Sequence, residues 1–330
     1  MTETDRTPAA PAGTPAEPAA NPAGAGAAAA PDPATTYRAP RNQWLDVWDQ
    51  FKSHRGALIG AAVFILILLA VTVGPYIWTI DPTYIDIRAK NQGPTLAHPL
   101  GTDQLGRDTL ARMLAGGRVS IAVGLTAMAL SIVIGTVIGV IAGYFKRLDG
   151  PLMRFTDLFL ALPLLPLLLV AVLLFRDMLS KAFGPEGGVF VLIVSLIGIT
   201  SWMQTARIVR GDVLALKERE FVLAGRSIGT PSRRMITRHI LPNVLSPIMV
   251  SATLGIATAI ITESALSFLG LGFPPDFPTW GRLLYDAVDQ MVLYPSRVIL
   301  PGIFISLTVL CVNYIGDGLR DAMDPRIRGR

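Results

Sequence analysis

The side chains best suited to metal binding or nucleophilic catalysis are few in this chain and widely separated. The three histidines stand at His54, His98 and His239, and the only cysteine, Cys311, lies within an apolar run. This spacing offers no metal-ligand set, and a single cysteine cannot form a disulfide within the chain. The sequence also lacks a Gly-x-x-x-x-Gly-Lys-Ser/Thr phosphate loop and a paired nucleophile and base. We therefore expect no enzymatic activity, no catalytic residue, no metal site and no cofactor bound by this chain.

The polar segment 216–243, between two apolar runs, has the clearest pattern of helix ends and turns. From residue 220 to residue 243 it reads EFVLAGRSIGTPSRRMITRHILPN. A first short helix is expected here, with apolar and small residues at helical spacing on one face. That face consists of Phe221, Ala224, Gly225 and Ile228.

The middle of this segment predicts a sharp bend between two helices. Gly229 is expected to end the first helix, because glycine adopts a positive φ without steric cost. Thr230 is then predicted to cap a second helix through its side chain, with Pro231 at the first helical position. We expect the second helix to continue to Leu241 and Pro242 to interrupt it before the next apolar run. We call residues 216–243 the elbow.

The composition indicates that lipid surrounds most of the chain. Of its 330 residues, 51% are hydrophobic and only 16% are charged, which is too apolar for an ordinary soluble domain. The formal net charge of +5 is compatible with nucleic-acid binding, but the basic residues lie in short stretches between apolar runs. A multi-pass membrane protein explains both features better.

Six apolar segments are long enough, or nearly long enough, to cross the bilayer as helices. They are residues 57–78, 119–144, 156–175, 189–206, 244–262 and 298–315. Pro163 and Pro166 in the third segment and Pro247 in the fifth are expected to bend those helices. The sequence therefore predicts an all-α membrane protein with six transmembrane helices in residues 57–330.

The positions of Lys and Arg predict the orientation in the membrane. Five lie before the first span, three between the second and third, eight between the fourth and fifth, and four after the sixth, so these regions hold twenty of the 29. By the positive-inside rule, both termini and the elbow are expected in the cytoplasm.

The region before the first span divides into two parts. Residues 1–40, rich in Ala and Pro, are predicted to be a disordered cytoplasmic tail rather than a signal peptide. Residues 41–56 carry Trp44, Leu45 and Trp48 at helical spacing, which predicts an amphipathic helix at the membrane interface. A helix packed against the rest of the protein is the alternative.

Two patterns within the spans indicate how the helices pack. Small residues recur every four positions in the second span, at Ser131, Gly135, Gly139 and Gly143, and predict close approach of another helix. Glu263, near the outer end of the fifth span, is an ionisable residue at the membrane. Such a residue indicates either a functional site or a capping or interhelical hydrogen bond.

The elbow resembles the cytoplasmic signature of the permeases of ATP-binding-cassette importers. That signature is Glu-Ala-Ala, three residues, Gly, nine residues, a hydrophobic residue and Leu-Pro. Aligned on Gly229, the match places Ala224 on the first alanine, and the closing Leu-Pro lies at residues 241–242, one position later than the stated spacing gives. Leu223 and Gly225 depart from the Glu and the second Ala. The flanking strings EFV and HILPN are instead typical of dipeptide and oligopeptide permeases.

Three other strings extend the resemblance from about residue 50 to the end of the chain. Residues 98–108 read HPLGTDQLGRD and are similar to the C-type permease subunit of peptide and nickel importers. The strings ESALSFLGLG at 263–272 and GDGLRD at 316–321 look like the same family. Within the external string we expect a structural turn capped by Thr102 or Asp103, with Asp108 starting the next helix.

The resemblance implies a type I importer architecture in which this chain forms half of a pathway for small peptides. It implies that the elbow couples to an ATPase on another chain, which holds ATP and Mg, through Glu220, the residues of the first face, Gly229, Leu241 and Pro242. It also implies a homologous second permease, two ATPase subunits or domains, and an extracytoplasmic substrate-binding protein. The sequence does not specify which residues contact substrate.

Alternative functions make different demands on the sequence. Nickel or another small solute is the alternative substrate within the same importer class. A secondary transporter working without ATP predicts ionisable residues in mid-span, and the six spans are nearly free of charge. A purely structural subunit needs no docking elbow.

Overall fold

The computed structural model describes residues 43–323, and every regular element in that range is helical. The longer elements are α1 (Gln43–Ser53), α2 (Arg55–Ile77), α3 (Thr109–Tyr144), α4 (Lys146–Ala161), α5 (Leu164–Phe183), α6 (Pro185–Lys217), α7 (Glu220–Ser227), α9 (Leu241–Phe268), α10 (Trp280–Ala287) and α11 (Ser296–Met323). The shorter ones are α8 (Ser232–Met235), a π-helical turn (Ile236–Ile240) and two 3₁₀ turns, Ile87–Ala89 and Val288–Gln290.

Within residues 43–323, five helices are long and apolar enough to cross a membrane. They are α2, α3, α6, the continuous run Ser232–Phe268 that joins α8 to α9, and α11. These confirm five of the predicted spans, although each helix extends beyond the apolar core that predicted it. The prediction of a tail over residues 1–40 lies outside the described residues.

The third predicted segment, residues 156–175, is divided between two helices, and the bend expected at Pro163 is confirmed. α4 ends at Ala161 and α5 begins at Leu164, and the two helices are bent by 85° at the break. Pro163 stands at the break as the N-cap of α5, and Leu162 before it is extended, with ψ 135°. A residue before proline disfavours the helical region, so the chain bends here. The protein has a sixth span if this bent pair crosses as one unit.

The small-residue ridge of α3 lies against α6, as the sequence predicts. A Cβ atom added at Gly139 would lie 2.6 Å from the carbonyl oxygen of Ala206, and one at Gly143 would lie 2.7 Å from Val213. Ser131 on the same ridge is fully buried. Because glycine removes the side chain, the two backbones approach closely along this line.

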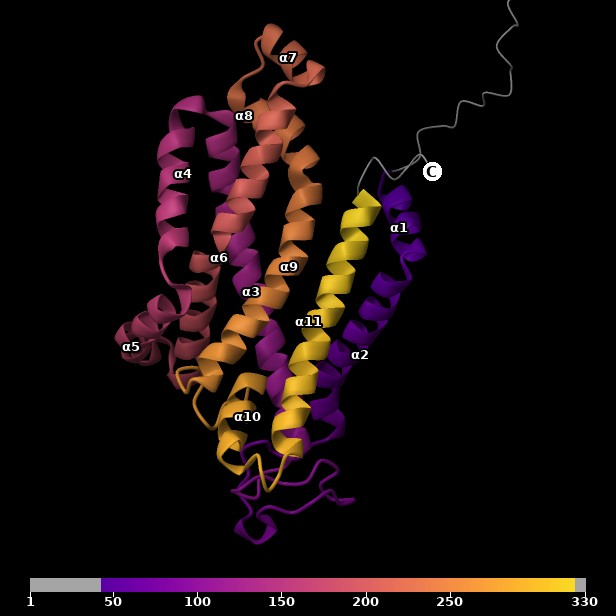
Figure 1. Cartoon of the computed structure of the whole chain (residues 1–330), viewed down its shortest axis with the longest axis vertical. Helices are drawn as coiled ribbons and strands as arrows, with labels where there is room; N and C mark the ends of the chain where they lie inside the picture. The colour runs from indigo at the N-terminus through magenta and orange to yellow at the C-terminus, as the bar shows by residue number, and fades with distance from the viewer. Residues whose placement is uncertain (1–42, 324–330) are drawn as a thin grey trace, which may run out of the picture. The chain divides into compact units, whose positions relative to one another are not determined.

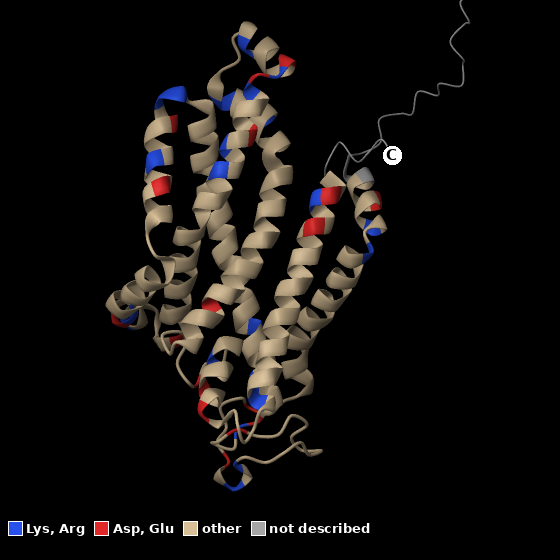
Figure 2. Cartoon of the chain, viewed as in Figure 1, with Lys and Arg blue, Asp and Glu red and all other residues tan. Residues whose placement is uncertain are grey.

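The polar elements gather at the two ends of the helices. Figure 1 shows α7 and α8 at one end, and α10 with the loop between α2 and α3 at the other. Lys, Arg, Asp and Glu are concentrated near these ends, and the middle of the helices is almost free of them (Figure 2). Such a band is what a bilayer core requires.

The helix predicted before the first span is present as α1, but it divides its apolar residues between two environments. Val47 and Phe51 are buried against Ala57 and Ala322. Leu45 and Trp48 are more than half exposed. One side of α1 therefore packs on the bundle, and the other presents apolar surface. Its location at the membrane interface stays a prediction.

Candidate functional site

The elbow contains a sharp, well-bonded turn at its tip. Gly229 has φ +77°, which confirms that it ends the first helix, α7. The Gly229 N–H donates to the carbonyl of Arg226 at 2.9 Å, and the Thr230 N–H donates to the carbonyl of Gly225 at 3.1 Å. These two bonds form a Schellman motif, which satisfies carbonyls at the helix end.

The second helix of the elbow begins differently from the prediction. Pro231, not Thr230, is the N-cap of α8, and its cap position has no side-chain hydrogen bond. The Thr230 backbone is already held by the turn that ends α7. The predicted Thr230 side-chain cap is therefore wrong, because the Schellman turn fixes the residue before the second helix can begin.

The predicted break at Pro242 is also wrong, because the helix continues through it. The turn Ile236–Ile240 is π-helical, and the Leu241 N–H donates to the carbonyl of Ile236, five residues earlier. In a regular α-helix the ring of Pro242 would meet the carbonyl four residues earlier, and the wider turn accommodates it. The Asn243 side chain donates to the carbonyl of His239 at 2.7 Å. The helix therefore runs without interruption into α9.

The predicted apolar face of α7 divides into an outward and an inward part. Phe221 is 45% exposed and Ile228 is 83% exposed, and Ala224 between them is exposed too. Gly225 points instead toward Met235, whose terminal methyl would lie 2.6 Å from an added Cβ. The outward part is an apolar surface with no covering element among the described residues. We call Phe221, Ala224 and Ile228 the outer face.

The elbow is anchored to the bundle by residues that sequence reasoning missed. Val222, Met235 and Ile240 are fully buried and join a cluster with Val209 and Val213 of α6. Val222 stands three residues before Gly225, and this i, i+3 spacing was the available signal that the two share the inward face.

The root of the elbow is fixed to the end of α3. The Lys217 ammonium donates to the carbonyls of Gly143 and Tyr144 at 3.0 and 3.2 Å. Arg226 of α7 lies over the Tyr144 ring, 5.5 Å from its centre. A cation beside the last carbonyls of a helix is favourable, because those groups carry partial negative charge. These contacts hold α7 in place relative to the spans.

The other coupling residues of the sequence prediction lie around this tip. Glu220 is exposed at the start of α7, whereas Leu241 is half-buried and Pro242 exposed at the start of α9. The structure thus brings Phe221, Ala224 and Ile228 onto one surface. It places Leu241 and Pro242 after the π turn, at the start of α9.

Glu263 is fully buried at the far end of α9 and makes an interhelical bond, one of the two roles expected for it. Ser120 of α3 donates to one carboxylate oxygen at 2.9 Å, and Ser267 donates to the other at 2.8 Å. Ser120 also accepts the Trp280 backbone N–H of α10 at 3.2 Å. Glu263 therefore connects α9, α3 and α10 through hydroxyl donors.

The string at residues 98–108 forms the structural turn that the sequence predicts. Asp108 is the N-cap of α3 and accepts the Ala111 N–H at 2.6 Å. Its carboxylate also receives the Trp78 indole N–H at 3.0 Å and lies 2.8 Å from the His98 ring. Asp103 accepts the backbone N–H of Leu105 and caps the turn. This part of the motif is structural.

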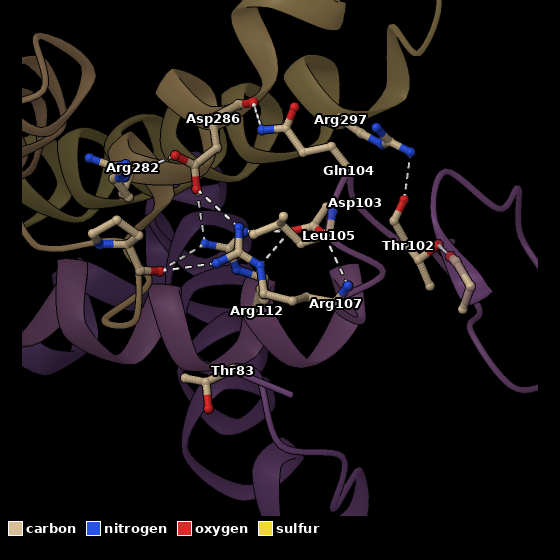
Figure 3. A network of polar contacts seen from close by, with 12 residues as sticks. Thr83, Thr102, Asp103, Gln104, Leu105, Arg107, Arg112, Arg282, Asp286 and Arg297 are labelled. Carbon is tan, nitrogen blue, oxygen red and sulfur yellow. Dashed lines mark hydrogen bonds and ion pairs between the residues drawn. The ribbon is translucent and has the colours of Figure 1, made fainter. Parts of the chain in front are cut away.

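Asp103 is also the centre of an ionic network that includes two arginines (Figure 3). Its carboxylate binds Arg107 at 2.7 Å and Arg112 at 2.8 Å. Burial acts to raise the pKa of Asp103, but the two guanidiniums and the hydrogen bonds from Arg107 outweigh it and hold the pKa below its usual value. Asp103 is therefore ionised at neutral pH.

The network continues into α10 and α11, which sequence reasoning did not connect to it. Asp286 receives Arg112 at 3.0 Å and Arg282 at 2.9 Å. Arg297 donates to the side chains of Asn91 and Gln290 and to the carbonyl of Thr102. Partners up to 206 residues apart in the chain meet here, and no periodicity in the sequence indicates such pairs.

Within residues 43–323 no group of three or more His, Cys, Asp or Glu side chains is placed to hold a metal ion. The carboxylates described above are occupied by arginine, histidine or hydroxyl partners.

Comparison with known proteins assigns the chain to a family. The profile described as binding-protein-dependent transport system inner membrane component matches residues 135–329. The profile of the N-terminal transmembrane domain of oligopeptide transport permease C matches residues 42–94. Together the two matches include the elbow, α1 and α2.

Curated relatives cover most of the chain. The oligopeptide transport system permease protein of Bacillus subtilis is 38% identical over 86% of this chain and 90% of its own length. The glutathione transport system permease protein of Pectobacterium atrosepticum is 37% identical, with 90% and 95% covered. The dipeptide transport system permease protein of Alkalihalophilus pseudofirmus is 36% identical, with 90% and 94% covered.

Among solved structures, an inward-facing methionine ABC transporter chain aligns with a TM-score of 0.48 and 16% identity, covering 63% of this chain and 95% of that one. The family profile and the curated relatives confirm the resemblance that the elbow motif indicated. This chain belongs to the family of binding-protein-dependent transport system inner membrane components.

Proposed function

We propose that this chain is a permease subunit of an ATP-driven importer and forms half of a pathway for small peptides. The family membership supports the permease role. The curated relatives named above are permeases for oligopeptides, dipeptides and glutathione, and all three substrates are short peptides. Peptides are therefore the substrate class favoured over nickel or another small solute.

The observation that carries the coupling role is the outer face of the elbow. Apolar side chains as exposed as Ile228 are ordinary in lipid, but this one stands at a polar tip beyond the end of the apolar bundle. An amphipathic helix that lays such a face into a groove on another protein is a recurring recognition mode. We assign that groove to a cytoplasmic ATPase, which binds ATP and Mg.

The elbow is built to transmit a displacement rather than absorb it. Val222 and Met235 hold α7 on the bundle, and Lys217 ties its root to α3. The run Ser232–Phe268 then continues as one helix to Glu263, which bonds to α3 and α10 at the other end. A movement of α7 when the ATPases close would thus shift the spans as packed units, as in other shear and rocking transitions.

The proposal specifies partners and orientation. Because one chain supplies five or six spans, a homologous second permease would complete the pathway, with two ATPase subunits or domains and an extracytoplasmic binding protein. The distribution of Lys and Arg supports a cytoplasmic location for both termini and for the elbow of this cell-membrane protein.

Site-specific photocrosslinking in intact membranes tests the docking role. A benzoylphenylalanine at Ile228 is expected to capture the ATPase, and the same probe at Val292, which is 87% exposed near α10, is the matched control. Capture of no ATPase from Ile228, or equal capture from Val292, contradicts the proposal.

The orientation is tested separately. Ile228→Cys should react with a membrane-impermeant maleimide only after the membrane is opened, and Val292→Cys should react from outside. The chain's own Cys311 is buried and contributes little background. Labelling of Ile228→Cys in sealed cells would place the elbow on the outer side and end the coupling assignment.

A further inference from the structure

A small cavity lies within the ionic network at the end of the bundle opposite the elbow. Its volume is about 30 Å³, and it is lined by the first turns of α3, by α10 and by the start of α11. Its polar lining residues include Thr109, Arg112 and Arg297. Its apolar lining residues include Met113 and Leu283. The cavity thus combines charged and hydrocarbon lining.

Two of the residues that line the cavity carry a buried donor with no hydrogen-bond partner among the described residues. The two donors are the Thr109 hydroxyl and the Nε of Arg112. Thr109 is 7% exposed and Arg112 is 1% exposed, although the two terminal nitrogens of Arg112 are bonded to other groups. A buried donor left unsatisfied costs about 1–3 kcal/mol. Residues three apart share a helix face, so both donors serve the same side of α3.

The network around the cavity carries an excess of positive charge. Three guanidiniums, those of Arg107, Arg112 and Arg282, share the carboxylates of Asp103 and Asp286, and Arg297 adds a fourth positive charge (Figure 3). Arg297 has no carboxylate within ion-pair distance in the described part of the chain, and the groups that accept its hydrogen bonds are neutral oxygens. Removing charge from water is costly unless an opposite charge compensates it, so this region favours an anion.

The shape and walls of the cavity restrict the kind of anion. A space of about 10–15 Å³ suffices for one water, so this cavity has room for the three heavy atoms of a carboxylate group, and an attached stem must extend out of it. Asp103 and Asp286 also line it and would repel a doubly charged phosphate. The apolar lining residues Met113, Leu283 and Pro301 suit a short hydrocarbon stem.

We infer that this cavity binds a single carboxylate on a short apolar stem, held by Thr109, Arg112 and Arg297. Carboxylates match the planar donor geometry of guanidinium groups. The same chemistry has two sources at this end of the molecule: the C-terminus of a peptide, and the side chain of an acidic residue on a docked protein. The site is separate from the elbow, so its failure and the failure of ATPase coupling are distinguishable.

The test uses the complex isolated from membranes through a tag on this chain and placed in lipid nanodiscs. The midpoint temperature at which this chain loses solubility is measured with sodium propionate, tri-alanine or tri-alanine amide, each against sodium chloride at equal ionic strength. Thr109→Val removes the free hydroxyl. Thr126→Val is the matched control, because the Thr126 hydroxyl is exposed on the same helix and bonds to its own turn.

The expected result is a saturable rise in the midpoint with propionate that Thr109→Val weakens at least five-fold in apparent affinity and Thr126→Val leaves unchanged. A similar rise with tri-alanine but not with its amide identifies a peptide C-terminus as the source. A response to propionate alone identifies a protein side chain.

No saturable effect of either carboxylate beyond sodium chloride overturns the inference, as does an equal response in Thr109→Val. Tri-alanine and its amide acting alike, without any propionate effect, also overturns it. Should Thr109→Val fail to accumulate, Thr109→Ser, which keeps the hydroxyl, is expected to bind as the native chain does, and the native chain alone decides whether carboxylates bind.

Discussion

Met235 fills the space that a side chain at Gly225 would occupy, and through this contact the second helix of the elbow holds the first. The terminal methyl of Met235 would lie 2.6 Å from a Cβ at Gly225. Met235 is fully buried with Val222 and Ile240. The orientation of the outer face therefore depends on a residue pair across the Schellman turn.

Gly225→Leu should force the two helices of the elbow apart. Overpacking a closed contact costs about 1–3 kcal/mol, and α7 has few other anchors. We expect peptide-stimulated ATP hydrolysis by the complex to fall several-fold while this chain still accumulates in the membrane. Adding Met235→Ala should restore much of the activity, because it vacates the space. A double variant no better than Gly225→Leu would show that the contact does not set the elbow.

Gly229 tests backbone conformation apart from packing. No atom lies within 4 Å of a Cβ at this position, yet its φ is +77°. Gly229→Val should therefore lower the stability of the folded elbow by about 1–2 kcal/mol, because valine is strained in the left-handed region of φ and ψ. Gly229→Asn should be nearly neutral, since asparagine adopts this region more readily. ATPase stimulation and limited proteolysis of the elbow measure the effect, and equal losses for both variants would contradict it.

Glu263 should stabilise the end of the bundle that lies opposite the elbow. Glu263→Ala leaves a cavity and removes the acceptor of the Ser120 and Ser267 hydroxyls. We expect this variant to lower the free energy of unfolding by about 3 kcal/mol. Glu263→Gln keeps the shape and one acceptor, and the hydroxyls can rotate, so about 1 kcal/mol is expected. Thermal unfolding in nanodiscs measures both. Thr258→Val, at an exposed position of the same helix, is the control.

The stability contributed by Asp103 should depend on acid pH. Because its pKa in the folded protein is lowered, the unfolded chain binds the proton first, and the contribution is fully present above the unfolded pKa near 3.8. The contribution of Asp103 to stability disappears as the pH falls from there through the lowered pKa of the folded protein. The difference in midpoint temperature between the native chain and Asp103→Asn should thus be constant from pH 7 to about pH 5.

That difference should narrow only below about pH 4. A difference that changed between pH 7 and pH 5 would mean that a titratable group other than Asp103 controls the stability of this end of the protein.

Composition, run length and short motifs were enough to predict that lipid surrounds the chain, that it has six long apolar segments, and to which family it belongs. Apolar run length reports bilayer thickness directly, and Gly229 indicated its turn because a positive φ is a property of one residue. The sequence also predicted the small-residue ridge of α3, since residues at every fourth position share one helix face.

Tertiary structure decided the features that depend on two distant segments or on competing local bonds. The sequence predicted a bend at Pro163 and a break at Pro242, but the helix continues through Pro242, because the π-helical turn before it accommodates the proline ring. The inward turn of Gly225 needed Met235, and the carboxylate cavity needed α3, α10 and α11 to meet. The spacing of residues along the chain does not indicate which distant side chain will neutralise a charge or fill a space. Only the packing of the folded chain decides these partners.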